Sequence, residues 1–499
     1  MAVAVSLRSD SLLNLLKPTF IQGVEDLRNS EVFFFNSLEE FSGGTLEGDT
    51  LKFSVASQRA AGYRSIPIHD ASYPPAPDLT TNTGEITAAR HAGTISVDDY
   101  AELKTMSDVG AFTRASAIAA ESFYKDMREI MEFESLRNGS GILNQYGGIG
   151  NVTSVTSDNW TFDVSIFDEP AFAPGRTIQF VTLTGIGTNY LSVTTARNTT
   201  FRDYPTQGYY TIKSNQRLPS SGLCRVTIKE RSPGTNSPAS PAGAYANVTP
   251  GSTSTNLDFA ILADAVTENT SPSTTNLTRQ MMGIDGIVNG PNGVSSTGWG
   301  YETGAAWLQQ EKQGTALSDD TFEGLSPSTI GDWSSFVMDA TSYGSTLTTP
   351  MLARAMTYQN VFGVTGTNQW VRWIAHPMQL NEYALTLESK ERYCITANTP
   401  SSLPAGRASL NQRNGQGEAL AYAGIPMFGN RFCRVDRVYA LNSMCARKKT
   451  LKPFAFNPAH PNYSNRIVTE MNGHCAEQLL AVNRGHGMAI HNLAIPSAI

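Results

Sequence analysis

One long stretch of this chain, Asp108 to Gly139, constrains the fold more than any other. It reads DVGAFTRASAIAAESFYKDMREIMEFESLRNG and carries apolar residues at spacings of three and four. That period places one narrow, alanine-rich apolar stripe along a single helix. The stripe consists of Phe112, Ala115, Ala119, Phe123, Met127 and Ile130.

Both ends of the stretch carry residues that start or stop helices. Ser107 and Asp108 offer side-chain oxygens that accept hydrogen bonds at a helix N-terminus, and Asn138-Gly139 tolerates the left-handed conformation at a C-terminus. A helix of about thirty residues is roughly 45 Å long, well beyond the usual length. We therefore expect a spine helix with something flat, a sheet, along one side only.

The size and composition of the chain indicate several folded domains. Its 499 residues exceed one compact core, so we expect roughly two to four domains. With 40% hydrophobic and 16% charged residues, the chain belongs to the folded rather than the disordered proteins. The formal net charge of −7 excludes a protein that grips nucleic acid over its whole surface, so any contact with DNA is local or absent.

No segment predicts export or membrane insertion. Arg8 and Asp10 interrupt the first apolar residues, which argues against a secretory signal, and no run of about eighteen apolar residues predicts a membrane span. The cysteines are widely spaced and lack CxxC pairs, so we expect reduced thiols in a cytoplasmic protein rather than a disulfide framework or a zinc ribbon. They are Cys224, Cys394, Cys433, Cys445 and Cys475.

Residues 1–45 predict an arm that lies against something else. The amphipathic pieces in it are too short to be stable helices alone. Phe33, Phe34 and Phe35 are followed by Phe41, which is too much apolar surface for a free tail. We expect these residues to be buried against the spine helix or a neighbouring subunit.

Residues 46–100 predict a long hairpin. Two runs with apolar residues at every second position flank a loop that holds several prolines. An isolated two-stranded ribbon is marginal in water, so we expect this one to dock on a partner surface. The alternating residues are Leu51, Phe53 and Val55 in the first run, and Ile86, Ile95 and Val97 in the second.

The remainder divides into a β-rich part and a mixed part. Residues 146–280 contain short runs of β-branched and aromatic residues between Gly, Pro and Asn, which predicts an inserted antiparallel β-domain that folds as a unit. Residues 281–499 return to mixed signals. Thr349-Pro350 predicts a helix start, QWVRWIAHP predicts a buried strand, and MQLNEYALTLESKE predicts another helix.

No pattern in the sequence predicts an active site. HExxH, GxSxG, GxxxxGK[ST] and a strand-bound GxGxxG are all missing. His376 stands alone before a proline, which is typical of a structural histidine, and no histidines have the spacing of metal ligands. We expect a non-enzymatic protein without a cofactor or a metal. A carbohydrate-binding or hydrolytic β-protein remains a rival, but it needs aligned aromatic residues and a carboxylate pair.

The order of these parts resembles a known family. The residues that carry the resemblance are GDTLKF at the start of the ribbon, the alanine-rich spine ending in LRNG, the segment WVRWIAHPMQLNEYAL, and the segment GEALAYAGIPMFGNRFCRVDRVYALN. Together they resemble the major capsid protein of tailed double-stranded DNA bacteriophages, with its Hong Kong 97 type fold. The match covers roughly residues 1–140 and 280–499.

The resemblance implies an α+β fold with named parts. These are an N-terminal arm (1–45), an extended E-loop hairpin (46–100), the spine helix of a peripheral domain (101–145), an inserted β-rich domain (146–280), and an axial domain with returning peripheral strands (281–499). It also implies a structural coat protein in the virion, assembled in the host cytoplasm as hexamers and pentamers of an icosahedral shell. Its partners would be a scaffolding protein, a portal, decoration proteins and packaged double-stranded DNA. The DNA would be held without sequence-specific contact, and no membrane would be involved. An encapsulin-like bacterial compartment shell is the alternative.

Charge placement suggests how the ribbon meets a neighbouring subunit. The ribbon carries Lys52, Arg59 and Arg64 without an acidic residue between them, whereas the spine is acidic. We expect the two to attract each other across a subunit boundary. Lys52 lies at the base of the ribbon rather than at its tip, which argues against a covalent crosslink from a ribbon lysine to a neighbouring subunit. The predicted contact residues are Lys52, Phe53, Arg59, Arg64, Glu121, Asp126, Glu129, Glu132, Phe33, Phe34 and Phe35.

Overall fold

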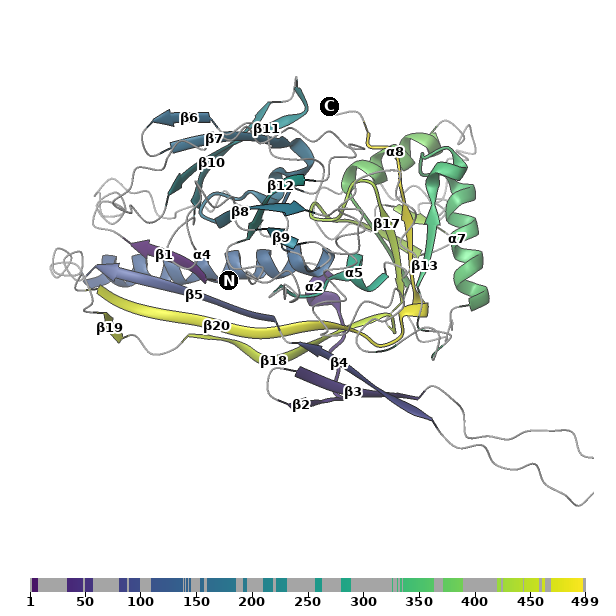
Figure 1. Ribbon diagram of the computed structural model, residues 1–499, viewed down its shortest axis with the longest axis horizontal. Helices are drawn as coiled ribbons and strands as arrows, with labels where there is room; N and C mark the ends of the chain where they lie inside the picture. The colour runs from purple at the N-terminus through teal and green to yellow at the C-terminus, as the bar shows by residue number, and fades with distance from the viewer. Residues whose placement is uncertain are drawn as a thin grey trace, which may run out of the picture.

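The structure is a computed structural model whose described strands form four sheets around and beside one long helix (Figure 1). It describes residues 2–7, 34–47, 50–56, 80–87, 89–98, 109–137, 139, 141, 143–144, 153–156, 159–184, 192–194, 210–218, 221–230, 256–262, 280–288, 325, 330, 333, 335–362, 371–388, 420–422, 425–442, 444–456, 460–462 and 468–496.

The long helix α4 (Val109–Leu136) confirms the predicted spine. It ends where the sequence predicts, because Gly139 adopts the left-handed conformation with φ 77°. The predicted N-cap residues, Ser107 and Asp108, lie outside the described residues.

A long, twisted sheet lies against one side of α4. Its strand order is β1-β5-β20-β18, with β19 paired to β20. Phe123 and Tyr124 of α4 contact Phe454 of this sheet, with ring centroids 5.9 and 5.4 Å apart. The strands are β1 (Ala2–Leu7), β5 (Ala89–Asp98), β18 (Ala446–Phe456), β19 (His460–Asn462) and β20 (Val468–Ala481).

Two strands of this sheet differ from the sequence expectation. The arm begins with β1, which pairs in parallel with β5, although no strand was expected there. The residues Ile95 and Val97 were assigned to the ribbon, and that assignment is wrong, because β5 pairs with β20 in the long sheet. A period of two identifies a strand but does not say which sheet it joins.

The ribbon is a small three-stranded sheet, and its hairpin pairing is as predicted. Strand β3 (Thr50–Ala56) pairs antiparallel with β4 (Thr81–Thr87), and β2 (Thr45–Glu47) adds a third strand. Phe53 lies opposite Gly84, where a Cβ would come within 2.5 Å of the phenylalanine ring. Glycine at this position therefore lets the aromatic ring lie flat across the neighbouring strand. The sheet extends away from the rest of the molecule (Figure 1).

The β-rich residues form one antiparallel sheet on the other side of α4 from the long sheet (Figure 1). In β7 every second residue is buried, so Trp160, Phe162 and Val164 face the core. The strands are β6 (Thr153–Thr156), β7 (Asn159–Ser165), β8 (Thr177–Thr184), β9 (Ser192–Thr194), β10 (Tyr210–Leu218), β11 (Leu223–Glu230) and β12 (Asn256–Leu262). A 3-10 turn, η1 (Ile166–Ala171), follows β7.

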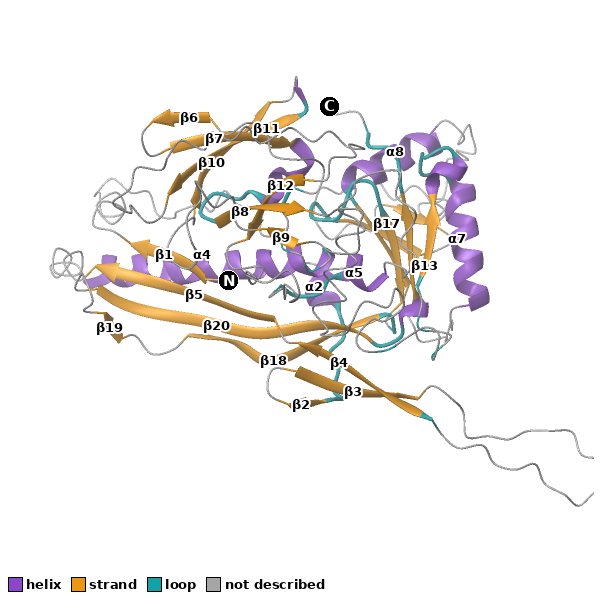
Figure 2. Ribbon diagram, in the orientation of Figure 1, coloured by secondary structure: helices purple, strands orange, loops and turns teal. Residues whose placement is uncertain are grey.

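The C-terminal residues form a six-stranded mixed sheet with two helices, as the mixed signals predicted (Figure 2). Helix α7 (Thr349–Phe362) begins at the predicted Thr349-Pro350, and the carbonyl of Thr348 accepts its first helical hydrogen bond. The strands are β13 (Phe336–Asp339), β14 (Val371–Ala375), β15 (Leu420–Tyr422), β16 (Ile425–Gly429), β17 (Val438–Asn442) and β21 (Gly487–His491), and the second helix is α8 (Pro377–Glu388). The shorter elements of the described residues are α2 (Phe34–Ser37), α5 (Ile284–Val288), η3 (Ala340–Tyr343) and η4 (Arg484–His486).

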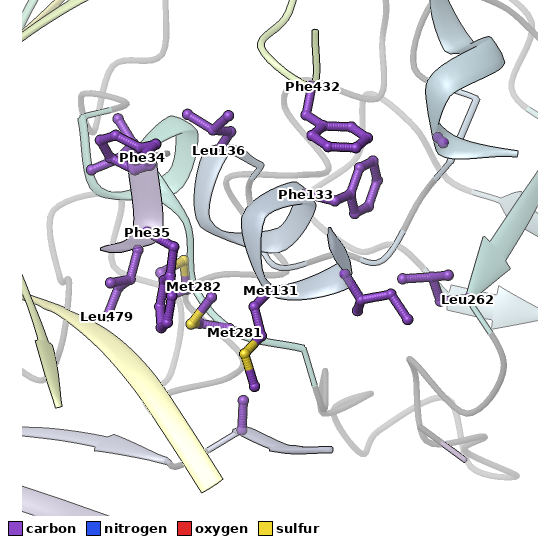
Figure 3. Packing of buried hydrophobic residues seen from close by; sticks show 14 of the residues in the cluster. Phe34, Phe35, Met131, Phe133, Leu136, Leu262, Met281, Met282, Phe432 and Leu479 are labelled. Carbon is purple, nitrogen blue, oxygen red and sulfur yellow. The ribbon is translucent and has the colours of Figure 1, made fainter. Parts of the chain in front are cut away.

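The core joins the parts that the sequence separates. One hydrophobic cluster runs from the seven-stranded sheet past α4 to the long sheet and the ribbon, while the six-stranded sheet and its helices have a second cluster. Every residue from Glu129 to Arg137 is buried, so the expectation of a sheet on one side only is wrong for the last two turns of α4. Figure 3 shows Phe34 beside Leu136, whereas Phe133 faces Phe432.

Candidate assembly site

Three glutamates in the buried C-terminal turns of α4 hold separate segments of the chain together. Glu129, Glu132 and Glu134 are each almost completely buried. A buried carboxylate is costly unless hydrogen bonds or opposite charges compensate it, so the partners of these residues determine what α4 can hold in place.

Glu132 fixes the end of the N-terminal arm. Its two carboxylate oxygens accept hydrogen bonds from the backbone N–H groups of Phe34 and Phe35, both at 2.8 Å. The side-chain amide of Asn430 donates a third bond at 2.6 Å. The carboxylate thus caps the first turn of α2 from a different helix, and both phenylalanines are buried.

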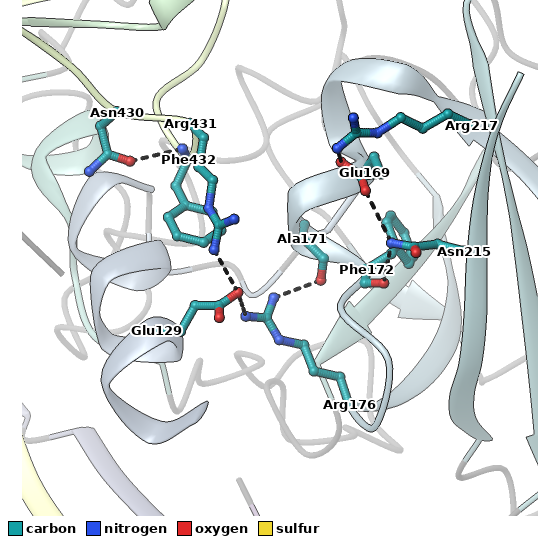
Figure 4. Close-up of polar contacts among 10 residues, drawn as sticks. All are labelled: Glu129, Glu169, Ala171, Phe172, Arg176, Asn215, Arg217, Asn430, Arg431 and Phe432. Atoms are coloured by element: carbon teal, nitrogen blue, oxygen red, sulfur yellow. Dashed lines mark hydrogen bonds and ion pairs between the residues drawn. The ribbon is translucent and has the colours of Figure 1, made fainter. Parts of the chain in front are cut away.

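Glu129 faces the other way and binds two arginines (Figure 4). Arg176, directly before β8, donates to Glu129 at 3.0 Å and also donates to the carbonyl of Ala171 at 2.7 Å. Arg431, in the turn after β16, approaches the same carboxylate oxygen at 3.3 Å. Glu129 therefore connects the spine to the seven-stranded sheet and to the C-terminal part.

Glu134 binds the chain where it returns from the seven-stranded sheet. It accepts a hydrogen bond from the backbone N–H of Met281 at 2.9 Å and lies 3.3 Å from Nε2 of His91 in β5. Two residues further on, Gly283 is so close to α4 that a Cβ would lie 2.1 Å from the carbonyl oxygen of Arg137. Only glycine allows this approach of the two backbones.

The base of the ribbon is anchored on its own subunit. Leu51, Phe53 and Ile86 are buried in the main cluster, and the ring of Phe53 lies edge-on to that of Phe41 at 6.2 Å. Lys449 of β18 donates a hydrogen bond to the carbonyl of Phe41 at 3.0 Å. The expectation that the ribbon needs a partner surface to dock is therefore wrong for its base, because the arm supplies that surface.

A buried ionic network stiffens the junction between α5 and the six-stranded sheet. Asp285 of α5 bonds the guanidinium of Arg437 and the hydroxyl of Tyr439. Burial alone would raise the pKa of Asp285, but Arg437 and Arg434 hold it below its usual range. Asp436 accepts two hydrogen bonds from Arg434. These charges compensate one another, which is typical of a structural joint.

Two buried histidines have surroundings that hold them neutral. Nδ1 of His376 accepts a hydrogen bond from the N–H of Met378, and so caps α8. Burial, assisted by the positive charge of Arg137, lowers the pKa of His376 to about 4. Burial and Arg437 likewise hold the pKa of His491 well below its usual range. The lone histidine expected to be structural is found at a helix start.

The predicted contact residues are separated by the fold. Phe34 and Phe35 are buried against α4 of their own subunit, which is one of the two alternatives that the sequence left open. Lys52 is half-buried on β3, across the strand from Glu85. Phe33, Arg59 and Arg64 lie outside the described residues.

Two of the four spine carboxylates cannot act as predicted. Glu129 and Glu132 were expected to attract a neighbour's ribbon, and that expectation is wrong, because both are buried and hydrogen-bonded within their own chain. Glu121 is exposed and pairs with Lys125 at 3.1 Å, and Asp126 is half-buried. The sequence signal that was missed is the dense apolar surrounding of Glu129 and Glu132.

The described residues lack the features that the rival functions need. Among them, no group of His, Cys, Asp and Glu side chains is arranged to hold a metal ion. Trp160, Phe162 and Tyr210 of the seven-stranded sheet point into its core, so within the described part of that sheet they form no aromatic platform for a sugar. No helix in the described ranges has the length and apolar character needed to cross a membrane.

Comparisons with known proteins give structural neighbours only. No protein-family model and no curated protein matches the chain. The chain resembles the cyanophage A-1(L) capsid asymmetric unit with a TM-score of 0.43 and 10% identity, covering 98% of this chain and 99% of that one. It resembles the capsid of cyanophage P-SCSP1u with a TM-score of 0.40 and 8% identity, covering 96% of this chain and 93% of that one. A third similar structure is the SrpI encapsulin complex of Synechococcus elongatus, with a TM-score of 0.24 and 9% identity over 39% of this chain and 64% of that one.

Proposed function

We propose that this chain is the major capsid protein of a tailed double-stranded DNA bacteriophage, a structural coat protein that assembles into an icosahedral head. The observation that carries the proposal is the ribbon. Its base is held in the core of its own subunit while the sheet extends away from the rest of the molecule (Figure 1). A rigidly anchored extension has no surface to contact in a monomer, but it suits a subunit that reaches over a neighbour.

The parts of the molecule then take the roles that the Hong Kong 97 type fold gives them. The arm and spine occupy residues 1–45 and 101–145, the ribbon is the part of 46–100 that ends with β4, and the insertion occupies 146–280. The six-stranded sheet with α7 and α8 is the centre of the axial domain within 281–499. Because the long sheet takes strands from both ends of the chain, it serves as the peripheral domain.

The same proposal includes the partners. The subunits form hexamers and pentamers, with a scaffolding protein, a portal and decoration proteins as further components, and the shell encloses double-stranded DNA. Assembly takes place in the host cytoplasm, and the product is the virion. The chain has no enzymatic role in this scheme.

An encapsulin-like compartment shell is the second candidate, because it would use the same ribbon and spine. The seven-stranded sheet favours the phage head. It adds a complete layer to the subunit beyond what a minimal shell requires.

Electron microscopy of the purified full-length chain tests the function directly. We expect closed shells or capsomers, and a variant with residues 57–79 replaced by a short Gly/Ser turn should give folded subunits that do not close into shells. Circular dichroism and thermal unfolding provide the control for folding. Dispersed monomers from the unaltered chain, under conditions that keep it folded, would contradict the proposal.

We also propose a contact between the ribbon and a neighbour's spine, now without the buried Glu129 and Glu132. Arg59 and Arg64 of the ribbon attract Glu121 and Asp126 on the outer part of a neighbour's α4. Each exposed pair contributes only about 0–1 kcal/mol, but the contact repeats around every capsomer. Reversing both arginines to glutamate should abolish shells, and reversing both acidic residues to arginine in the same chain should partly restore them. Unchanged shell yield after the first pair of reversals would exclude this contact.

A further inference from the structure

The six-stranded sheet is buried on both faces, and the two faces belong to different hydrophobic clusters. Along β17, Val438 and Ala440 pack in the second cluster with α7 and α8, whereas Tyr439 and Leu441 pack in the main cluster. Strand β21 alternates in the same way, with Ile490 in the second cluster. Figure 1 draws α5 between the end of α4 and this sheet. The face toward the main cluster is therefore where the sheet is joined to the rest of the molecule.

Helix α5 packs closely against this face. Gly487, the first residue of β21, lies so near to α5 that a Cβ would come within 2.9 Å of the side chain of Val288. Nε of Arg484 donates a hydrogen bond to the carbonyl of Ile287 at 2.8 Å. Nearer the start of the helix, the carboxylate of Asp285 binds charged and polar side chains of the sheet. The contact therefore combines apolar packing with buried charge.

The charges at this contact are bound to one another. Asp285 accepts hydrogen bonds from Arg437 and Tyr439, and Asp436 accepts two from Arg434 at 2.9 and 2.6 Å. Nε of Arg437 also lies 3.9 Å from Asp436. We call these five side chains the α5 joint. A further positive charge in the same buried space would meet two guanidinium groups as well as the two carboxylates that they already bind.

His491 is a group that can bring such a charge. It follows Ile490 in β21, so it lies on the face toward α5, and it is only 2% exposed. Its Nε2 is buried and has no hydrogen-bond partner among the described residues. A protonated imidazole carries an N–H on both ring nitrogens, so the charged form would leave a buried donor without an acceptor. The closed contact therefore favours neutral His491.

The electrostatics of the joint agree with this geometry. Burial, followed by the positive charge of Arg437, holds the pKa of His491 well below its usual range, although Asp285 and Asp436 act in the opposite direction. Burial alone would raise the pKa values of the two carboxylates, but the arginines hold both below their usual range. Both carboxylates therefore stay ionised at pH 4.5, and His491 is the member of this group that gains a proton when the contact opens.

The remaining described groups beside His491 keep their charge between pH 7 and 4.5. Burial raises the pKa values of Cys433 and Tyr439, so both stay protonated. Asp339 is the register partner of His491 in β13. Burial would raise the pKa of Asp339, but hydrogen bonds from Thr341 hold it below its usual range, so this carboxylate stays ionised.

We propose that His491 is an acid-sensitive switch, whose protonation separates α5 from the six-stranded sheet while the sheet and its helices remain folded. The two clusters make this possible, because the sheet keeps its packing against α7 and α8 when the other face opens. The switch belongs to the single subunit. It therefore goes beyond the proposed capsid function and does not depend on it.

Proton linkage gives the expected size of the effect. In the open state His491 contacts water and has an ordinary pKa of about 6.5, whereas the closed state holds it neutral. Because the open state binds the proton more tightly, the closed state loses stability as the pH falls below that value. The ratio of open to closed molecules should rise by up to roughly 80-fold between pH 7 and 4.5.

Hydrogen exchange of the full-length, unassembled chain between pH 7 and 4.5 tests the switch, after correction for the intrinsic pH dependence of amide exchange. The reporting peptide covers α5, whose five residues are too few for a helix that is stable alone. The reference peptides cover β17 and α7. The test variant is His491→Asn. The matched control is His376→Asn, which removes another buried histidine, one that caps α8 instead of facing α5.

We expect exchange in α5 to become faster as the pH falls, by up to roughly 80-fold, while β17 and α7 stay protected. His491→Asn should lose this pH dependence and His376→Asn should keep it. The inference is overturned if α5 shows no pH dependence in the unaltered chain, if β17 and α7 open together with it, or if His491→Asn keeps the dependence. Thermal unfolding shows whether each variant is folded, and the first two outcomes need no variant. Shell formation is measured separately by electron microscopy, so a failed switch leaves the proposed function standing.

Discussion

The sharpest consequence of the structure concerns Glu132, which the sequence placed at a subunit boundary and the fold places at the root of the arm. Replacing it by glutamine keeps the shape of the side chain but removes the charge. It also replaces one acceptor oxygen by an NH2 group, which cannot accept. The three groups that donate to Glu132 are the N–H groups of Phe34 and Phe35 and the amide of Asn430.

The magnitude follows from those three hydrogen bonds. A hydrogen bond to a charged group contributes about 1.5–3 kcal/mol, and a buried donor left without an acceptor costs about 1–3 kcal/mol. In Glu132→Gln at least one backbone N–H loses its acceptor and the other bonds lose their charge assistance. We therefore expect the docked arm to be destabilised by about 3 kcal/mol, which increases its open population roughly 100-fold.

Hydrogen exchange of the full-length, unassembled chain measures this opening directly. The amide hydrogens of Phe34 and Phe35 are the ones that Glu132 protects, so a peptide covering residues 31–38 should exchange about 100-fold faster in the variant. The matched control is Glu121→Gln on the same helix, where the side chain is 67% exposed and pairs only with Lys125 among the contacts described. Equal exchange of this peptide in the two variants would refute the role given to Glu132.

Two further predictions follow from buried groups elsewhere. Because the pKa of His376 is lowered from 6.5 to about 4, the unfolded chain binds the extra proton between these values, and stability should fall as the pH drops through that window, by at most about 3 kcal/mol. His376→Asn should flatten this pH dependence of stability in urea unfolding between pH 6.5 and 4. An unchanged slope of stability against pH would contradict the role given to His376. Gly283→Ala should lower the free energy of unfolding by more than about 3 kcal/mol, because the new Cβ would lie 2.1 and 2.2 Å from backbone oxygens. Gly429→Ala is the control in thermal unfolding, because its Cβ would meet only side-chain and Cα carbons at 3.4 Å or more.

Elements with a strong local signal could be predicted from the sequence. The spine has 28 residues of helical period and a glycine at its end, so its position follows from local physics alone. The same holds for α8, where proline occupies the first helical position directly after His376. Short-range chemistry decides these elements, and the rest of the fold adds little to them.

Elements that depend on distant partners could not be predicted in the same way. Strand β18 reads ARKKTLKPFAF, in which lysines and Pro453 hide the alternation, and its register with β20 shifts twice. Its lysines have apolar stems that cover the sheet, so they are compatible with a strand although they look like a solvated segment. Likewise β1 becomes a strand only because β5 provides an edge for it.

The buried glutamates show the same limit in the site. Sequence reasoning counted Glu129 and Glu132 among the exposed charges that meet a neighbour's ribbon, because an acidic helix face usually points to solvent. Their partners are far away in the chain, with Asn430 separated from Glu132 by 298 residues and Phe34 by 98. Nothing local predicts such a contact. The useful signal was Ile130, Met131 and Phe133 around these charges, which marks a helix segment that is apolar on every side.

These distant partners also order the steps that lead to a shell. The spine can form early, because its contacts are local, but its glutamates remain solvated until the arm and the C-terminal turn arrive. The ribbon rests on Phe41 and on the cluster that contains Phe34, so it acquires a fixed direction only after the arm has closed on Glu132. A subunit should therefore become competent for assembly only when its chain is complete. On this reasoning Glu132→Gln lowers shell yield although the residue is buried within its own subunit, and a yield equal to that of the unaltered chain, measured by sedimentation, would show that the ribbon is positioned without the arm.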